Sequence, residues 1–312
     1  MLQIGQLGRL LVRIMASVYQ SKNVACEGSS GVKNRPIFVY SSGIGMTNLK
    51  RIGKFLGRYV FRHPLYVLTY GLFYFRKEGV ANVHLYTESE MKNLIQAGKS
   101  LVRFGDGEVN VLLSLNNHYQ SYSPEMERML KKIIRDYTPQ SPYILAVPRF
   151  VNVSNEELKR IGKFNVWLPL KAMFRLWFPQ NVAYMDAHNF YYDEYFDSIV
   201  GPLLADRHVI LVTNEETIDK QKQNPRLPWK EFSGVATPKE NSLAAYDTIK
   251  EEVKNEVERV RRATDKSIVL LFALGPVGKY LTYEFALSGV QSLDIGKVAE
   301  VMYTGESVEW MI

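Results

Sequence analysis

An apolar strand predicted over residues 101–104 runs directly into a glycine-rich acidic turn, in the sequence Leu101-Val102-Arg103-Phe104-Gly105-Asp106-Gly107-Glu108. An apolar helix start follows at once, with Val109, Val111 and Leu112. A strand that passes through a tight turn into a helix is the building step of a parallel α/β sheet. Ligands bind such sheets beyond the carboxyl ends of the strands. The turn at residues 105–108 is therefore the first place to look for chemistry.

The rest of the chain from about residue 87 repeats this alternation. Apolar runs predict strands at 101–104, 143–147, 182–185, 208–212, 267–273 and 291–294. Helical patterns predict helices at 87–98, 124–136, 154–162, 191–204, 241–262 and 277–288. Thr87 with Glu90 forms a capping-box pattern, and Ser123 before Pro124 is a typical helix start. We therefore expect an α/β fold with a Rossmann-like, mostly parallel sheet and helices on both of its faces.

The positive charge of the chain is concentrated near its N-terminus. The net charge is +7, yet residues 1–77 alone hold twelve Lys and Arg against one acid, Glu27. Such asymmetry favours a basic arm that meets an anionic surface, joined to an ordinary domain. We expect a basic, amphipathic helical extension over residues 1–80 and a catalytic domain over 81–312.

Residues 47–63 carry an apolar stripe beside a basic stripe, a pattern typical of helices that lie in a membrane interface. The stripes are Leu49, Ile52, Leu56 and Val60, and Lys50, Lys54, Arg58 and Arg62. Pro64 then breaks the helix, and the aromatic rings of Tyr66, Tyr70, Phe73 and Tyr74 suit headgroup depth. We expect residues 47–76 to hold a cytoplasmic protein peripherally on the anionic inner face of the cell membrane. The alternative is a helical subdomain packed on the main fold.

Composition excludes several classes of protein. The single cysteine, Cys26, rules out an internal disulfide framework and a four-cysteine zinc site. No uncharged run reaches the roughly 18–20 residues of a spanning helix, and no basic segment precedes an apolar run as in a secretory signal peptide. A nucleic-acid partner is not expected, because the basic arm joins an acidic domain and no nucleic-acid-binding motif is present.

Three groups of polar residues follow predicted strands. In the first, Asp106 and Glu108 are two carboxylates two residues apart, which can converge on one hard cation; Gly105 and Gly107 permit a tight turn and close ligand approach. The alternative is an acidic turn that caps the next helix.

The second group follows the apolar strand at 268–273. A turn with Gly275, Gly278 and Lys279 opens a helix there, and a helix N-terminus can bind an anion. A plain strand-to-helix turn fits the two glycines equally well. Asp294 ends another strand and can bind ribose hydroxyls or a metal, or cap its loop.

The third group is Asp186 and His188, after a short apolar strand. They suit a metal ligand, an acceptor base or an acceptor contact, although an isolated histidine near aromatics is more often structural. Arg149, which follows the strand at 143–147, can meet a phosphate or be an ordinary surface arginine.

These motifs together resemble the GT-D fold glycosyltransferases, over roughly residues 87–300. The matching elements are Arg103-Phe104-Gly105-Asp106-Gly107-Glu108, Tyr119-Gln120, Ala146-Val147-Pro148 and Gly275-Pro276…Ala286…Gly289…Leu293-Asp294-Ile295-Gly296. The resemblance implies a Rossmann-like domain, a nucleotide-sugar donor, and a divalent metal held through an Asp-x-Glu element that maps onto Asp106 and Glu108. The chain departs from the family at 184–189, where Met185 and His188-Asn189 replace an expected glycine and an arginine-containing segment. The acceptor therefore stays open.

The function that we expect is transfer of a hexose or related sugar from a UDP-sugar donor to a glycan, glycolipid or glycoprotein of the bacterial surface. Mn²⁺ or Mg²⁺ on Asp106 and Glu108 would stabilise the leaving diphosphate. Asp186 and Asp294 are candidates for the catalytic base. The donor-binding residues are predicted as Arg103, Gly105, Gly107, Gly275, Gly278, Lys279 and Asp294. Alternatives are another nucleotide-cofactor enzyme on a Rossmann-like fold, and a non-catalytic binding protein of a polysaccharide system.

Overall fold

The apolar runs of the sequence form a single seven-stranded sheet in which every pair of neighbouring described strands is parallel. The structure is a computed structural model that describes residues 63–75, 83–117, 120–189, 198–223 and 229–298. The strand order is β3-β2-β1-β7-β6-β4-β5. The strands are β1 (Ser100–Arg103), β2 (Tyr143–Val147), β3 (Met185–Asp186), β4 (His208–Thr213), β5 (Glu231–Ala236), β6 (Ile268–Phe272) and β7 (Ser292–Asp294).

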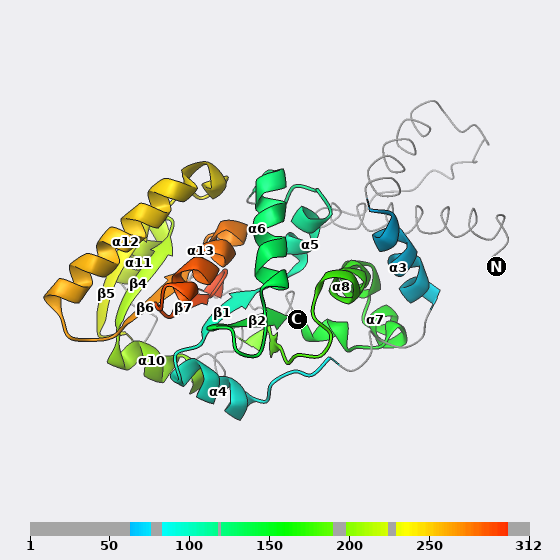
Figure 1. The fold of residues 1–312 in the computed structure, drawn as a ribbon, viewed down its shortest axis with the longest axis horizontal. Helices are drawn as coiled ribbons and strands as arrows, with labels where there is room; N and C mark the ends of the chain where they lie inside the picture. Colours follow the sequence, from blue (N-terminus) through cyan, green and yellow to red (C-terminus); the bar gives the residue numbers. More distant parts are fainter. Residues whose placement is uncertain (1–62, 76–82, 118–119, 190–197, 224–228, 299–312) are drawn as a thin grey trace, which may run out of the picture. The chain divides into compact units, whose positions relative to one another are not determined.

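Helices alternate with these strands along the chain (Figure 1). The main ones are α4 (Glu88–Gln96), α5 (Asp106–Leu112), α6 (Pro124–Arg135), α10 (Gly201–Asp206), α11 (Glu215–Gln223), α12 (Tyr246–Ala263) and α13 (Gly275–Leu287). The predicted starts of α4 and α6 are confirmed. Thr87 and Glu90 form a reciprocal capping box, and Ser123 accepts a hydrogen bond from the N–H of Met126 at 3.0 Å.

Both faces of the sheet are covered, as the sequence predicted. One face contributes alternate side chains such as Leu101, Leu211 and Leu293 to a fully buried cluster that also contains residues of α4, α10 and α11. The intervening strand residues point the other way, where α12 and α13 lie against the sheet. A parallel sheet needs this double cover because its strands are apolar on both faces.

Several elements differ from the prediction. The edge strand β5 was missed because it is partly exposed and mixes polar with apolar residues, so it shows no apolar run. Its Gly234 is needed for packing, since a Cβ there would lie 2.7 Å from the Ile218 side chain of α11. The helices α11 and α8 (Phe164–Trp177) were also missed. The helix predicted over 191–204 is described only from residue 198 onward, where residues 198–199 and α10 are helical.

Two compact units divide the chain: residues 1–81 with 153–176, and residues 82–152 with 177–312. We call them unit 1 and unit 2; the whole sheet belongs to unit 2. Residues 153–176 thus group with the N-terminal segment, although they lie inside the predicted catalytic domain. The domain boundary near residue 80 stays a prediction.

In unit 1, the predicted amphipathic stripes of residues 47–62 lie outside the described residues. The described part contains α3 (Pro64–Phe75), α7 (Asn155–Arg160) and most of α8. The expectation that the rings of Tyr66, Tyr70 and Phe73 settle among lipid headgroups is wrong, because all three are buried. None of the described helices combines the length and the apolar content that crossing a bilayer requires.

A buried lysine ties the three helices of unit 1 together. The Nζ of Lys171, on α8, donates to the carbonyl oxygen of Val153 and to the Oδ1 of Asn155, the latter at 2.9 Å. Asn155 in turn donates from its Nδ2 to the carbonyl oxygen of Phe73 on α3. Because both partners of the ammonium are neutral, burial lowers the pKa of Lys171 to about 8.

This lowered pKa predicts a pH-dependent stability. An unfolded lysine has a pKa of about 10.4, so between about pH 8 and pH 10 the unfolded chain binds the proton that the folded chain has released. The contribution of Lys171 to the free energy of unfolding therefore rises with pH across this window. Urea unfolding at several pH values should show that Lys171→Met loses stability relative to the unaltered chain as the pH rises from about 8 to 10, whereas Lys159→Met, an exposed control, keeps a constant difference. A constant difference for Lys171→Met as well would contradict the assignment.

Candidate active site

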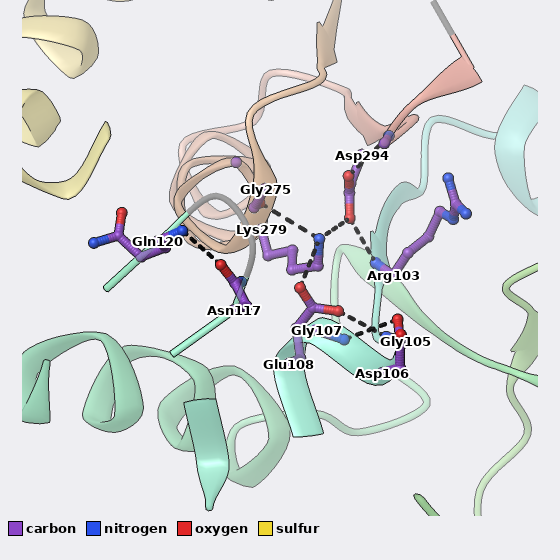
Figure 2. A network of polar contacts seen from close by, with 12 residues as sticks. Arg103, Gly105, Asp106, Gly107, Glu108, Asn117, Gln120, Gly275, Lys279 and Asp294 are labelled. Carbon is purple, nitrogen blue, oxygen red and sulfur yellow. Dashed lines mark hydrogen bonds and ion pairs between the residues drawn. The ribbon is translucent and has the colours of Figure 1, made fainter. Parts of the chain in front are cut away.

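The acidic turn predicted from the sequence lies where β1, β7 and α13 meet (Figure 2). β1 ends at Arg103 and α5 begins at Asp106, while β7 ends at Asp294. Since β1 and β7 are parallel neighbours, their carboxyl ends share one edge of the sheet. Helix α13 begins at Gly275 beside that edge and contacts β1, β6 and β7.

Glu108 folds back over its own turn. Its Oε2 accepts a hydrogen bond from the N–H of Gly105 at 2.7 Å, and its Oε1 lies 3.2 Å from the Nζ of Lys279. The residue is buried at 6% exposure. Glu108 therefore caps the start of α5, which was the alternative interpretation of the acidic turn, and both of its oxygens have partners.

Lys279 lies between two carboxylates. Its Nζ is 3.2 Å from Glu108 Oε1 and 3.2 Å from Asp294 Oδ2, and it donates to the carbonyl oxygen of Gly275 at 3.4 Å. Figure 2 shows the ammonium pointing between the two acids. Burial lowers the pKa of Lys279, but the charges of Asp294 and Glu108 outweigh it and leave the pKa above its usual value. The side chain is therefore charged, and we call Glu108, Lys279 and Asp294 the buried triad.

Asp294 is the most deeply buried acid of the triad, at 1% exposure. Its Oδ2 accepts from the N–H of Arg103, and its Oδ1 accepts from the N–H of Gly296, each at 3.2 Å. It thus caps the loop after β7 and fixes β1 beside it. A role in binding ribose stays a prediction, and in this structure the carboxylate faces the protein interior.

The guanidinium of Arg103 donates hydrogen bonds to two backbone carbonyl oxygens. Its Nε donates to Ala187 at 3.0 Å and its Nη1 donates to Ile295 at 2.8 Å. Arg103 was predicted to bind the donor. Here it joins the loops that follow β3 and β7, and Figure 2 shows its side chain directed away from Lys279.

Asp106 differs from these residues because it is exposed. It is the first residue of α5, and its Oδ1 accepts from the N–H of Gly107 at 2.9 Å. Of the charged side chains that Figure 2 labels, it is the one that solvent reaches freely, since the others are at most 8% exposed. A ligand that arrives at this edge therefore meets Asp106 first.

Each glycine of the predicted site occupies its position for a different structural reason. Gly275 begins α13 with φ of 61°, a left-handed conformation that favours glycine. A Cβ on Gly278 would lie 3.4 Å from side-chain atoms of Phe272 and Leu274, so glycine lets α13 pack closely on β6. Gly107 lies beside Asn117, which the sequence interpretation missed because no pattern marks it; a Cβ on Gly107 would lie 3.6 Å from its Nδ2.

The second half of the Tyr119-Gln120 motif ties together the loop after α5. The Oδ1 of Asn117 accepts from the N–H of Gln120 at 2.6 Å, and the Oε1 of Gln120 accepts from the N–H of Leu243 at 3.3 Å. Tyr119 lies outside the described residues. The motif therefore has a visible structural role next to the acidic turn.

A second polar group lies at the ends of β2 and β3. The Oδ1 of Asp186 accepts from the N–H groups of Arg149 and His188, at 3.2 and 3.0 Å. The Nε of Arg149 lies 3.9 Å from Asp186 Oδ2, and its side chain is 44% exposed. The His188 ring packs edge-on against Phe150. This group is linked to the buried triad by the bond from Arg103 to Ala187.

Among the described residues, no group of three or more His, Cys, Asp or Glu side chains is arranged so that it could hold a metal ion. Asp106 offers an exposed carboxylate, whereas Glu108 is engaged on both oxygens. Mg²⁺, however, is commonly held by one or two carboxylates together with phosphate oxygens of the substrate. The site thus fits a divalent cation that binds jointly with a phosphate ligand.

The part of the chain that holds this site is similar to known proteins. A family model described as "Glycosyltransferase GT-D fold" matches residues 101–304. "Glycosyltransferase GlyD" of Streptococcus pneumoniae is 24% identical over 240 residues, which are 70% of this chain and 26% of that protein. "Probable glycosyl transferase Gly" of Streptococcus gordonii is 22% identical over 223 residues, 68% of this chain and 31% of that one. The chain thus spans less than a third of the length of these relatives.

Solved structures show the same fold. A structure described as domain of unknown function 1792 with a distinct glycosyltransferase fold has a TM-score of 0.61 at 18% identity, covering 73% of this chain and 84% of that one. A glycosyltransferase of the same domain type from Streptococcus sanguinis has a TM-score of 0.60 at 19% identity, covering 72% and 87%.

The buried triad predicts a large loss of stability when Lys279 is removed. Lys279→Met would leave Glu108 and Asp294 as two buried acids without their counter-ion, and such changes cost about 3–5 kcal/mol. Lys220→Met, which breaks an exposed pair with Glu216, is the matched control and should change stability little. Urea unfolding measures both variants. Equal, small losses would show that the triad does not hold the site together.

Proposed function

The chain belongs to the GT-D fold glycosyltransferases, and on that premise we propose that it transfers a hexose from a UDP-sugar donor to a bacterial surface glycan or glycoconjugate, assisted by Mn²⁺ or Mg²⁺. The family match covers the residues that carry the acidic turn, the buried triad and the end of β7. We assign no more specific substrate of the relatives to this chain, because the chain covers only part of their length.

The observation that carries the proposal is the exposed carboxylate of Asp106, which makes the site net negative because the four charges buried beneath it balance. Arg103 and Lys279 supply two positive charges against three carboxylates, and both cations are buried on protein partners. A diphosphate approaching this edge would be repelled unless a cation accompanied it. A divalent cation is the simplest group that would offset the negative charges of both the site and the donor diphosphate.

Asp106 is the residue that we propose to hold this ion, with phosphate oxygens of the donor completing its shell. Oxygen ligands of this kind suit Mg²⁺ and Mn²⁺. When bound, such an ion neutralises charge on the departing nucleotide. Direct binding by Glu108 remains a proposal as well, and it requires Glu108 Oε1 to be shared with the ammonium of Lys279.

The buried triad has a different proposed role, which is to position the turn. Glu108 holds the N–H of Gly105, so the backbone around Asp106 keeps one conformation. Asp294 and Arg103 fix β1 beside β7 under that turn. Because such preorganised groups do not have to rearrange during the reaction, they lower its barrier. Gly275 and Gly278 would act by allowing α13 to start close to the donor phosphates.

Asp186 is the better of the two proposed catalytic bases. Asp294 is buried at 1% exposure and accepts backbone hydrogen bonds on both oxygens, whereas Asp186, at 7% exposure, accepts them on Oδ1 and has its Oδ2 3.9 Å from the Nε of the half-exposed Arg149. A base must come within hydrogen-bond reach of the acceptor hydroxyl. We therefore place the acceptor over the ends of β2 and β3, next to the donor over β1 and β7.

Location on the cytoplasmic face of the cell membrane is part of the same proposal. The support is the charge of residues 1–77, which suits an anionic leaflet. A lipid-linked acceptor held in that leaflet would diffuse in two dimensions toward the enzyme.

Replacing Asp106 by Asn should abolish metal-assisted chemistry and leave the fold intact. We expect release of nucleotide from a UDP-sugar with Mn²⁺ to fall about 100-fold or more, the usual effect of losing a group that stabilises transition-state charge. A panel of nucleotide sugars with the purified protein measures the release. Chelation of the metal in the unaltered protein should have the same effect.

The control is Asp265→Asn, an exposed aspartate before the amino end of β6. It should release nucleotide at the unaltered rate. Full activity of Asp106→Asn, or of the unaltered protein in excess chelator, would overturn the metal proposal. Absence of release with every donor, together with absence of UDP binding, would favour a non-catalytic binding protein.

A further inference from the structure

Unit 1 and unit 2 carry opposite net charges. Over the sequence, unit 1 contains 17 Lys and Arg against four Asp and Glu, a net charge of +13, and unit 2 contains 22 against 28, a net charge of −6. Residues 153–176 add five basic residues and two acids to unit 1. The basic character is therefore not confined to the N-terminal segment, and a second part of the chain shares it.

Exposed apolar side chains are also concentrated in unit 1. Among the described residues, the large hydrophobic side chains that remain exposed are Leu68, Leu72, Ile161, Val166 and Leu287. The first four belong to unit 1, which holds the smaller share of the described residues. An isolated exposed leucine is ordinary, but a concentration in one small unit suggests an interaction surface.

The connection between α7 and α8 brings exposed apolar and basic residues together within eight positions. Ile161 is 38% exposed and Val166 is 48% exposed. Lys159 and Arg160 precede Ile161, and Lys163 follows it. We call residues 159–166 the basic loop.

The backbone of the basic loop turns sharply at Gly162. This residue has a φ of 70°, and a Cβ placed on it would meet no atom within 4 Å. The loop tip is therefore open on that side. On the inner side, Phe164, Trp167 and Leu168 are buried and anchor the start of α8. The loop presents Ile161 outward from a firmly packed base.

Two of the basic residues are held at the surface by local contacts. Arg160 pairs with Glu157 through two nitrogens, at 2.7 and 2.5 Å, and Lys159 lies over the Phe164 ring at 4.9 Å from its centre. Both side chains are exposed. Exposed aliphatic side chains flanked by Lys and Arg suit the boundary between acyl chains and anionic headgroups.

We propose that the basic loop is a membrane contact, in which Ile161 and Val166 enter the interface of an anionic phospholipid bilayer and Lys159, Arg160 and Lys163 meet its headgroups. The occupant is a lipid surface because the unit carries a net charge of +13, which opposes burial against a second copy of itself. The contact lies outside the predicted anchor at 47–76 and does not depend on the chemistry at Asp106.

The test is flotation of the full chain with vesicles of phosphatidylcholine, either pure or with about a third of phosphatidylglycerol. We expect binding to the anionic vesicles alone. Replacing both apolar side chains, as Ile161→Ser with Val166→Ser, should weaken that binding at least about tenfold, because each side chain loses its apolar burial. The matched control is Leu287→Ser, which removes an exposed apolar side chain of unit 2 and should leave binding unchanged.

Unchanged binding of the double variant would overturn the proposal, even if the unaltered chain binds through another segment. So would absence of binding to anionic vesicles at low salt. Light scattering distinguishes the remaining case: a dimer that the double variant dissociates would make the loop a contact between copies. Release of nucleotide in solution should be the same in all variants, so that failure here is separate from failure of the proposed transfer reaction.

Discussion

The ammonium of Lys279 between Glu108 and Asp294 is the interaction on which the site depends. A buried charge is tolerated only when opposite charges and hydrogen bonds surround it, and here both acids lie 3.2 Å from the same nitrogen. The three residues come from α13, α5 and the end of β7, so one contact fixes three elements at the carboxyl edge of the sheet. Through Glu108, this contact is joined to the turn that carries Asp106.

The buried triad also decides which carboxylate meets a ligand. In the sequence, Asp106 and Glu108 form an equivalent pair; in the structure, Glu108 is buried as a cap and Asp106 is exposed. A rigid, buried frame with one exposed acid separates positioning from contact, which is how preorganised sites lower the barrier to a reaction. The same separation recurs at β2 and β3, where Asp186 fixes backbone groups and Arg149 remains half-exposed.

Much of the fold follows from the sequence, because strands buried on both faces have continuous apolar runs and helix starts have capping residues. The parallel sheet, the starts of α4 and α6, and the turn at Asp106 could be predicted in this way. The edge strand β5 could not, since it is partly exposed and mixes polar with apolar residues. Neither could α8, which is largely apolar and contains Pro169, so that no polar face marks it as a helix. The partners of Lys279 and the direction of Arg103 depend on contacts between distant segments, which no local pattern encodes.

The most direct measurement of the central claim is a crystal structure of the full chain with UDP and Mn²⁺. The account predicts that the diphosphate lies over the ends of β1 and β7, with the metal bound by Asp106 and phosphate oxygens. It also predicts that Lys279 remains between Glu108 and Asp294. A metal bound away from Asp106, or a nucleotide bound at the opposite edge of the sheet, would contradict it.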